Sequence, residues 1–254
     1  MIIDSHSHLQ LDDFKIDREE CISRCLKNDV KKILSIGFNN LTNTQALEMN
    51  QKYPDFAFNT AGLHPDEATA DYAKKIRELR DFLKNNKVYG IGECGLDYHY
   101  TKDNRDIQLI LFEDQIKLSI IYDLPLIIHS RDAIKDTFDL LKKYQGQVYG
   151  VLHCYSGSLE MAKEFIKIGF YIGIGGVITF KKAVNLKRVV KEIPLSKILV
   201  ETDCPFMTPV PYRGKRNESS YVKYILEEIA KLKEIDLKEA ENEILHNTCK
   251  VFKI

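Results

Sequence analysis

Short apolar runs alternate with longer amphipathic segments along the whole chain. The runs lie at Ile2–Asp4, Lys32–Ile36, Ala57–Gly62, Val88–Glu93, Leu126–His129, Tyr149–His153, Phe170–Ile174 and Ile198–Glu201. Apolar runs of this length, bounded by more polar segments, are typical of strands that are buried on both faces of a parallel sheet. The pattern therefore predicts eight parallel strands separated by helices.

The segments between the runs have helical periodicity. Their apolar residues recur at every third or fourth position, as in Ile134, Phe138 and Leu141, in Met161, Phe165 and Ile168, and in Tyr221, Ile225, Ile229 and Leu232. Asp132 and Ser158 are predicted to cap the first turns of two of these helices, and Gly169 is predicted to end the second. The segment Leu237–Phe252 is predicted to form one further helix at the C-terminus.

Eight strand–helix units in 254 residues match the size of a TIM (β/α)₈ barrel, although a doubly wound parallel sheet could use the same units. No low-complexity stretch, long linker or change in composition divides the chain. With 44% hydrophobic and 29% charged residues, the composition is typical of a globular protein. We therefore expect residues 1–254 to form a single α/β domain, and the placement of the polar residues decides between the two folds.

Residue types that bind metals lie at the ends of the predicted strands. His6 and His8 come after the first run, His64 after the third, Glu93 ends the fourth, His129 the fifth and His153 the sixth, and Asp203 follows the eighth. In a TIM barrel the carboxyl ends of all strands meet at one rim, where active sites lie. The sequence therefore predicts a TIM barrel with an additional C-terminal helix and a metal site at that rim. Histidines that only donate hydrogen bonds in a polar barrel mouth are the alternative, but they would not explain the acidic residues among them.

Six of these residues suit a site for two cations. The expected ligands are His6, His8, Glu93, His129, His153 and Asp203. His6 and His8 are two positions apart, so in a strand their side chains point to the same side. Six ligands are too many for one tetrahedral cation but fit two, with Glu93 as a bridge that relieves the repulsion between the cations. The ligand types suit Mg²⁺, Mn²⁺ or Zn²⁺ and do not choose among them.

The loop after the eighth run carries three positive charges. Arg213, Lys215 and Arg216 stand within four residues of a segment rich in Pro and Gly. TIM barrels often bind phosphate in the loops after strands 7 and 8, and arginine can hold a phosphate through two hydrogen bonds. We expect these residues to bind phosphate groups of the substrate, with a solvated charged loop as the alternative. His64 and Arg131 are further candidates for substrate binding.

Charge and cysteine content limit the possible partners and the compartment. Lys plus Arg and Asp plus Glu both number 37, so a nucleic acid is expected to bind at a local site only. The chain lacks a signal-peptide pattern, and no apolar run approaches the ~20 residues that span a bilayer. The six cysteines form no C-x-x-C pair, which predicts a cytoplasmic protein with free thiols and no membrane partner. Cys94, Cys154 and Cys204 each follow an expected ligand, so they are expected to face the helices.

Seven motifs, in order, resemble those of the TatD family of metal-dependent DNases within the amidohydrolase superfamily. They are Asp4–Leu9 (DSHSHL), Gly62–Pro65 (GLHP), Ile91–His99 (IGECGLDYH), Pro125–Arg131 (PLIIHSR), His153–Gly157 (HCYSG), Glu201–Pro205 (ETDCP) and Arg213–Glu218 (RGKRNE). The likeness covers essentially the whole chain. One departure is Ser219, where the family commonly has proline, and it affects no expected ligand.

The resemblance implies a division of the site and an activity. His6, His8, Glu93 and Asp203 would hold one metal, and Glu93, His129 and His153 the other. The implied reaction is hydrolysis of DNA phosphodiester bonds, with exonuclease action from a 3′ end. The expected partner is DNA, as single strands or 3′ ends, and the sequence does not decide between single- and double-stranded substrates. From the chemistry of such sites, Asp203 is expected to position the attacking water and to act as general base.

Two other functions remain open. Some TatD-like proteins are linked to hydrolysis of D-aminoacyl-tRNA, so a metal-dependent ester or amide hydrolase is the alternative enzyme. A metal-stabilised scaffold that binds nucleic acid or a partner is disfavoured, because structural zinc sites are closed by four ligands. We expect the protein to act as a monomer.

Overall fold

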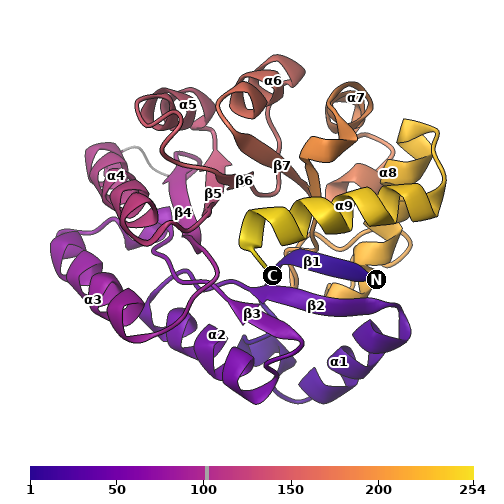
Figure 1. Ribbon diagram of the computed structural model, residues 1–254, viewed down its shortest axis with the longest axis horizontal. Coiled ribbons are helices and arrows are strands. Elements are labelled where there is room, and N and C mark those ends of the chain that lie inside the picture. Colours follow the sequence, from indigo (N-terminus) through magenta and orange to yellow (C-terminus); the bar gives the residue numbers. More distant parts are fainter. Residues whose placement is uncertain (101–102) are drawn as a thin grey trace.

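Eight parallel strands in the described part of the chain surround a common axis, with helices outside them (Figure 1). The structure is a computed structural model that describes residues 1–100 and 103–254. The strands are β1 (Ile2–Ser7), β2 (Val30–Ser35), β3 (Ala57–Asn59), β4 (Ile91–Asp97), β5 (Leu126–Arg131), β6 (Gly150–Leu152), β7 (Phe170–Ile174) and β8 (Ile198–Val200). The α-helices are α1 (Arg18–Lys27), α2 (Asn40–Lys52), α3 (Tyr72–Asn85), α4 (Arg105–Tyr122), α5 (Ile134–Lys142), α6 (Leu159–Lys167), α7 (Val184–Glu192), α8 (Val222–Lys233) and α9 (Leu237–Phe252).

The strands close into a barrel. Hydrogen bonds join β1, β2 and β3 in one parallel sheet and β4 to β8, in order, in a second. A parallel bridge between Ala61 and Ile91 connects β3 to β4, and another between Ser7 and Cys204 connects β1 to the chain after β8. The order β1 to β8 with closure between first and last is that of a TIM barrel, which confirms the predicted fold.

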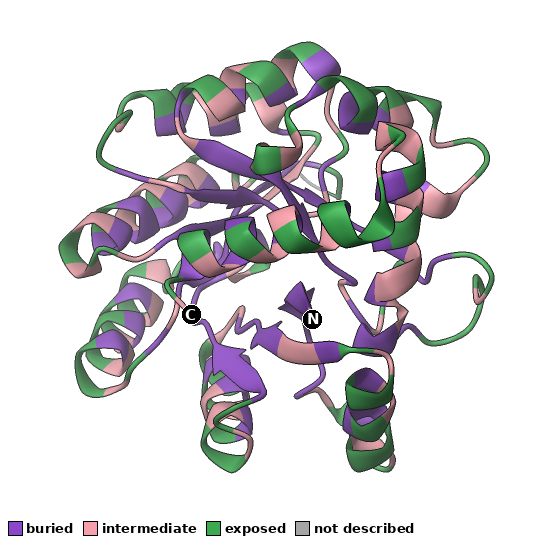
Figure 2. Ribbon diagram, turned by 45° about the vertical axis from the view of Figure 1, so that its right-hand side comes forward, coloured by how far each residue is buried: buried purple, intermediate pink, exposed green. Residues whose placement is uncertain are grey.

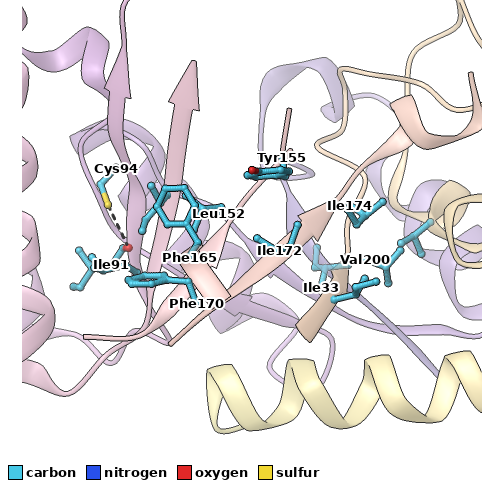
Figure 3. Close-up of a cluster of buried hydrophobic side chains, with 14 of the residues drawn as sticks. Ile33, Ile91, Cys94, Leu152, Tyr155, Phe165, Phe170, Ile172, Ile174 and Val200 are labelled. Atoms are coloured by element: carbon cyan, nitrogen blue, oxygen red, sulfur yellow. Dashed lines mark hydrogen bonds between the residues drawn. The ribbon is translucent and has the colours of Figure 1, made fainter. Parts of the chain in front are cut away.

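Side chains alternate between the inside and the outside of the barrel. One buried cluster contains Ile3, Leu34, Phe58, Ile127, Val151, Tyr171 and Leu199, one from each of seven strands, and fills the interior. Their neighbours along the strands, such as Ile33 and Ile172, belong to the larger cluster between strands and helices (Figure 3). Figure 2 shows the same division, with buried strands in the centre and helices that expose only their outer faces. The two-residue period therefore decides which residues reach the rim from the inside.

A conservative truncation in the outer layer should have a small but measurable cost. Ile172 of β7 is fully buried near Leu152 and Phe170 (Figure 3). We expect Ile172→Val to lower the free energy of unfolding by roughly 0.5–1.5 kcal/mol, because the lost methyl group leaves a small cavity. Urea titration followed by circular dichroism measures the change. Ile16→Val is the matched control, since Ile16 is 98% exposed; an equal loss in both variants would contradict the packing argument.

Most predicted elements occur at their expected places. β7 and α9 have the predicted bounds, and Ser158 caps α6 by accepting a hydrogen bond from the Met161 amide. The predicted cap at Asp132 is wrong, because α5 begins after Ala133 and the Asp132 carboxylate instead contacts His99. The predicted strand Val88–Glu93 is displaced: β4 runs from Ile91 to Asp97, so Glu93 lies inside the strand and not at its end.

The C-terminal helix closes the end of the barrel opposite the expected site. Val251 and Phe252 of α9 belong to the interior cluster, and Asn247 donates hydrogen bonds to the main chain at Leu195 and Ile198, at the start of β8. In Figure 1 this helix lies across the barrel beside β1. Ligands therefore have access to the interior from the carboxyl ends of the strands. No helix among residues 1–100 and 103–254 is both long enough and apolar enough to cross a membrane.

Candidate functional site

The barrel brings all six expected ligands to one rim. His6 lies in β1, Glu93 in β4 and His129 in β5, while His8, His153 and Asp203 lie just after β1, β6 and β8. His129 and His153 follow the interior residues Ile127 and Val151 by two positions, so they point into the same space one layer higher. Five of the six ligands, all but the fully buried His6, line a cavity of about 520 Å³.

Four of the six ligands form a group beside β1. The Nε2 atoms of His6 and His8 are 3.2 Å apart. They lie 3.5 and 3.8 Å from Oε2 of Glu93, and 3.7 and 3.5 Å from Oδ1 of Asp203. Ligand bonds of ~2.0–2.1 Å in tetrahedral geometry place ligand atoms about 3.3–3.4 Å apart. The spacing of these atoms therefore fits a divalent cation between them.

The other oxygen of Glu93 faces a second group. Its Oε1 lies 3.1 Å from Nδ1 of His129 and 2.9 Å from Nε2 of His153, and these two nitrogens are 3.3 Å apart. Nε2 of His64 is 3.8 Å from the same oxygen. His64, Glu93 and His129 satisfy the spacing of a metal-binding group, so His64, expected to contact substrate, could also act as a ligand.

The electrostatics of the cluster favour a cation. Burial opposes the ionisation of Glu93, but the surrounding histidines, His153 first, hold its pKa well below the usual range. Desolvation also opposes the ionisation of the half-buried Asp203, but its hydrogen bond with His8 helps to keep its pKa below the usual value. Burial, with the neighbouring His153, lowers the pKa of His6 to about 4. Glu93, Asp203 and His6 are thus in the protonation states that bind metals, whereas, against the effect of burial, hydrogen bonds and charges of the neighbouring carboxylates raise the pKa values of His8, His129 and His153, whose protons a cation would displace.

Asp97 is a functional candidate that the sequence analysis missed. Its Oδ2 lies 2.9 Å from Nε2 of His129, on the side of the ring opposite Glu93. Metal-binding histidines usually donate their second N–H to such a carboxylate, which fixes the tautomer and the ring orientation. Asp97 and Glu93 are four positions apart in β4, which puts both on one face. That signal was available, but the strand was predicted to end at Glu93.

Replacing the Asp97 carboxylate should disturb His129 without removing a ligand. In Asp97→Asn the side-chain amide can donate to Nε2, which would move the imidazole proton to Nδ1, the atom that faces Glu93. We expect metal affinity and turnover to fall about 10–100-fold. Asp132→Asn is the matched control, because Asp132 holds His99 at the same distance, 2.9 Å, on the exposed surface. Calorimetric Mn²⁺ titrations that give equal affinities for both variants would contradict this role.

Glu201 supports the site from behind. Its buried carboxylate accepts a hydrogen bond from the amide of Cys154, next to His153. A side chain at Gly173 would approach Glu201 Oε2 to 2.7 Å, so glycine leaves the necessary room. Burial raises the pKa of Glu201 to about 7. Glu201 therefore holds the loop after β6 next to His153.

The cysteines follow the expectation in two cases of three. Cys94 and Cys204 are buried in the core cluster outside the barrel. Cys154 lines the cavity, contrary to the expectation that it faces the helices. Its φ of 45° takes it out of the extended conformation, so the alternation of strand side chains does not apply there.

Of the residues expected to bind substrate, two line the cavity. They are His64 and Arg131, and the Arg131 guanidinium lies 5.2 Å from the centre of the exposed Tyr100 ring. Among the further lining residues that the sequence analysis did not single out are Phe38, Asp66, Phe206 and Met207. They come from loops after β2, β3 and β8, where no repeated pattern distinguishes them. The cavity thus combines a polar floor with apolar side chains at its edge.

The three cations of the β8–α8 loop lie elsewhere. Arg216 forms an ion pair with Asp17, Arg213 lies over the ring of Phe180 at 4.4 Å, and the amine of Lys215 is 5.6 Å from the ring centre of Tyr212. None of the three is among the described residues that line the cavity. The structure does not bring them to the metal ligands, so phosphate contacts from them require a substrate that extends beyond the cavity.

Comparisons with known proteins agree with this site. The sequence profile described as "TatD related DNase" matches residues 3–253. The "uncharacterized metal-dependent hydrolase YabD" of Bacillus subtilis is 44% identical over 255 residues, covering 100% of both chains. The crystal structure of YjjV, a TatD homologue of Escherichia coli, has a TM-score of 0.93 at 29% identity and covers 100% of this chain and 98% of its own. A TatD-family hydrolase of Entamoeba histolytica has a TM-score of 0.87 at 25% identity, with 99% and 97% covered.

Proposed function

Because the chain belongs to the TatD-related DNase family and is a metal-dependent hydrolase, we propose that it hydrolyses DNA phosphodiester bonds with two divalent cations. The observation that supports two cations is the position of Glu93. Its Oε2 lies 3.5 Å from His6 Nε2 and its Oε1 lies 2.9 Å from His153 Nε2, so each oxygen belongs to a different ligand group. A carboxylate shared in this way is suited to bridging two cations.

The proposal divides the six ligands between the two cations. His6, His8, Glu93 and Asp203 would hold one cation, and Glu93, His129 and His153 the other. When bound, such cations neutralise the charge of a phosphodiester and promote the ionisation of water near neutral pH. Oxygen and imidazole ligands are compatible with Mg²⁺, Mn²⁺ or Zn²⁺.

Side chains of this protein would orient the attacking water, accept its proton and bind the substrate. Asp203 is ionised, its side chain is 15% exposed, and it borders the cavity, so it can orient a water molecule and accept its proton as general base. Arg131 carries a fixed positive charge at the cavity edge, where it can bind a phosphate oxygen. The apolar edge residues Phe38 and Phe206 can exclude water around the bound strand.

The proposed substrate is a single DNA strand that enters by its 3′ end. An opening with room of about 520 Å³ suits a strand end better than a continuous duplex. The formal net charge of zero favours local contacts over a long electrostatic footprint. We also propose that the protein acts as a monomer, because a single copy of the chain supplies all six expected ligands.

Metal-dependent degradation of end-labelled oligonucleotides tests the proposal. We expect metal-free protein to be inactive, and Mg²⁺, Mn²⁺ or Zn²⁺ to restore the stepwise shortening of a 5′-labelled single strand. A 3′-labelled strand should release its label at once if hydrolysis starts at the 3′ end, whereas delayed release would reverse the polarity. No cleavage with any of the three metals would contradict the nuclease function. A charged tRNA would then be the next substrate, to test ester hydrolysis.

A further inference from the structure

A buried asparagine ties the β8–α8 loop to the turn that carries Asp203. Asn217 is fully buried, and its side-chain nitrogen lies 2.9 Å from the carbonyl oxygen of Thr202 and 2.6 Å from that of Phe206. Thr202 immediately precedes Asp203, and the amide of Phe206 donates to the Asp203 carbonyl at 2.9 Å. One amide group therefore bridges the main chain on both sides of Asp203.

The turn adopts a conformation that needs support. Asp203 has a φ of 57°, in the left-handed region that is uncommon for residues other than glycine, although aspartate and asparagine adopt it more readily than most. Its amide donates to the carbonyl of His6 at 2.9 Å, and the carbonyl of Cys204 accepts from the amide of His8 at 3.0 Å. These bonds fix the turn against β1. The carbonyls of Thr202 and Phe206, on either side of this turn, accept hydrogen bonds from the Asn217 side-chain amide.

Asn217 is itself held in place. Its main-chain amide donates to the carbonyl of Pro205 at 3.1 Å, and its side-chain oxygen accepts from the main-chain amide of Glu218 at 2.9 Å. The buried carboxylate of Glu218 forms an ion pair with Arg24 of α1, with nitrogen–oxygen distances of 2.9 and 2.6 Å. The loop is thus anchored to helix α1, and both donors of Asn217 have fixed directions.

We propose that Asn217 is a positioning residue that holds the carboxylate of Asp203 beside His6 and His8. It is not among the described side chains that line the cavity, so it acts through the main chain on either side of Asp203. Removing its amide leaves two carbonyls without their partner and frees the turn to leave the left-handed conformation. This inference rests on the proposed role of Asp203 as ligand and general base.

The chain offers a matched control at the other end of β8, the strand that precedes Asp203. Asn247 is 2% exposed, and its side-chain nitrogen donates to the carbonyls of Leu195 at 2.9 Å and Ile198 at 3.0 Å. Asn217→Ala and Asn247→Ala therefore each remove a buried amide that bridges two carbonyls next to β8. Only the first change lies beside Asp203.

The test compares the two variants in calorimetric Mn²⁺ titrations of metal-free protein, in single-stranded oligonucleotide hydrolysis and in thermal unfolding. We expect similar losses of thermal stability in both. Asn217→Ala should weaken Mn²⁺ binding about 10–100-fold and lower kcat by a similar factor, with KM unchanged. Asn247→Ala should keep the Mn²⁺ affinity and kcat of the wild type.

Wild-type Mn²⁺ affinity in Asn217→Ala, or an equal loss in Asn247→Ala, would overturn the inference. If Asn217→Ala does not fold, Asn217→Asp replaces it, because the aspartate keeps the size of the side chain but loses both donors. The same criteria then apply, with Asn247→Asp as control. A wild-type protein that cleaves no DNA would refute the proposed function alone, since the Mn²⁺ affinities of the variants would still decide the role of Asn217.

Discussion

Glu93→Gln is expected to abolish hydrolysis almost completely, with a loss of roughly 10⁴-fold or about 5.5 kcal/mol of transition-state stabilisation. The substitution keeps the size of the side chain but removes the negative charge that both ligand groups share. Glu93 lies within 3.8 Å of His6, His8 and His64, and within 3.1 Å of His129 and His153. Among the six, no other carboxylate has an oxygen in each group, so no neighbouring carboxylate can take over its bridging role.

Metal stoichiometry separates this explanation from a general loss of structure. The wild type should bind two equivalents of Mn²⁺, and Glu93→Gln should bind fewer and more weakly while it keeps its circular dichroism spectrum. Glu67→Gln is the matched control on the same rim, because Glu67 pairs with Lys75 at 2.8 Å, outside the cavity lining. If Glu93→Gln binds two equivalents with unchanged affinity and cleaves DNA at the wild-type rate, the two-cation scheme is wrong.

The barrel and its ligand-bearing rim were predictable because two independent patterns coincide. Eight apolar runs give the strands, and the position of His, Glu and Asp at their ends gives a common rim once the strands are parallel. His129 and His153 illustrate this, since each continues the inward alternation of an apolar strand by one step. Neither observation alone would have identified the site. A single H-x-H pair is weak evidence for metal binding, and a doubly wound sheet could use the same strands.

Strand ends at the rim were harder to predict, for a physical reason. β4 continues to Asp97; Cys94 and Leu96 pack in the outer core, but Asp97, on the same face as Glu93, is polar and contacts His129. The apolar run in the sequence therefore ends before the hydrogen bonds of the strand do. Asp97 was missed for this reason, although its spacing from Glu93 places it on the same face.

The cationic loop was misleading because charge along the sequence does not reveal its partners in space. Arg216 is paired with Asp17, nearly two hundred positions away, through a contact between the β8–α8 loop and the chain just before α1. Asn217 and Glu218 of the same motif are buried and hold the main chain. The motif that suggested phosphate binding thus contains residues that support Asp203, which only the tertiary contacts reveal.

Asp203→Asn should impair one ligand group and leave the other unchanged. Asparagine tolerates the left-handed conformation of residue 203 about as well as aspartate does, so the turn should persist. The variant loses one carboxylate of the group that contains His6 and His8, and it loses the proposed general base. We expect kcat to fall roughly 10³-fold, since general bases typically contribute 10²–10⁴-fold and a weakened ligand adds to the loss. KM for the oligonucleotide should change little, because Arg131 and the apolar edge of the cavity remain.

Calorimetry gives the sharper result for Asp203→Asn. The affinity for one Mn²⁺ equivalent should fall. The affinity for the equivalent held by Glu93, His129 and His153 should stay the same, since Asp203 contributes no atom to that group. Asp123→Asn controls for the substitution itself, because Asp123 is also left-handed, with a φ of 50°, and ends α4 away from the rim. Uniform weakening of both equivalents would mean that the two groups act as one site. Unchanged binding with full activity would remove Asp203 from the mechanism.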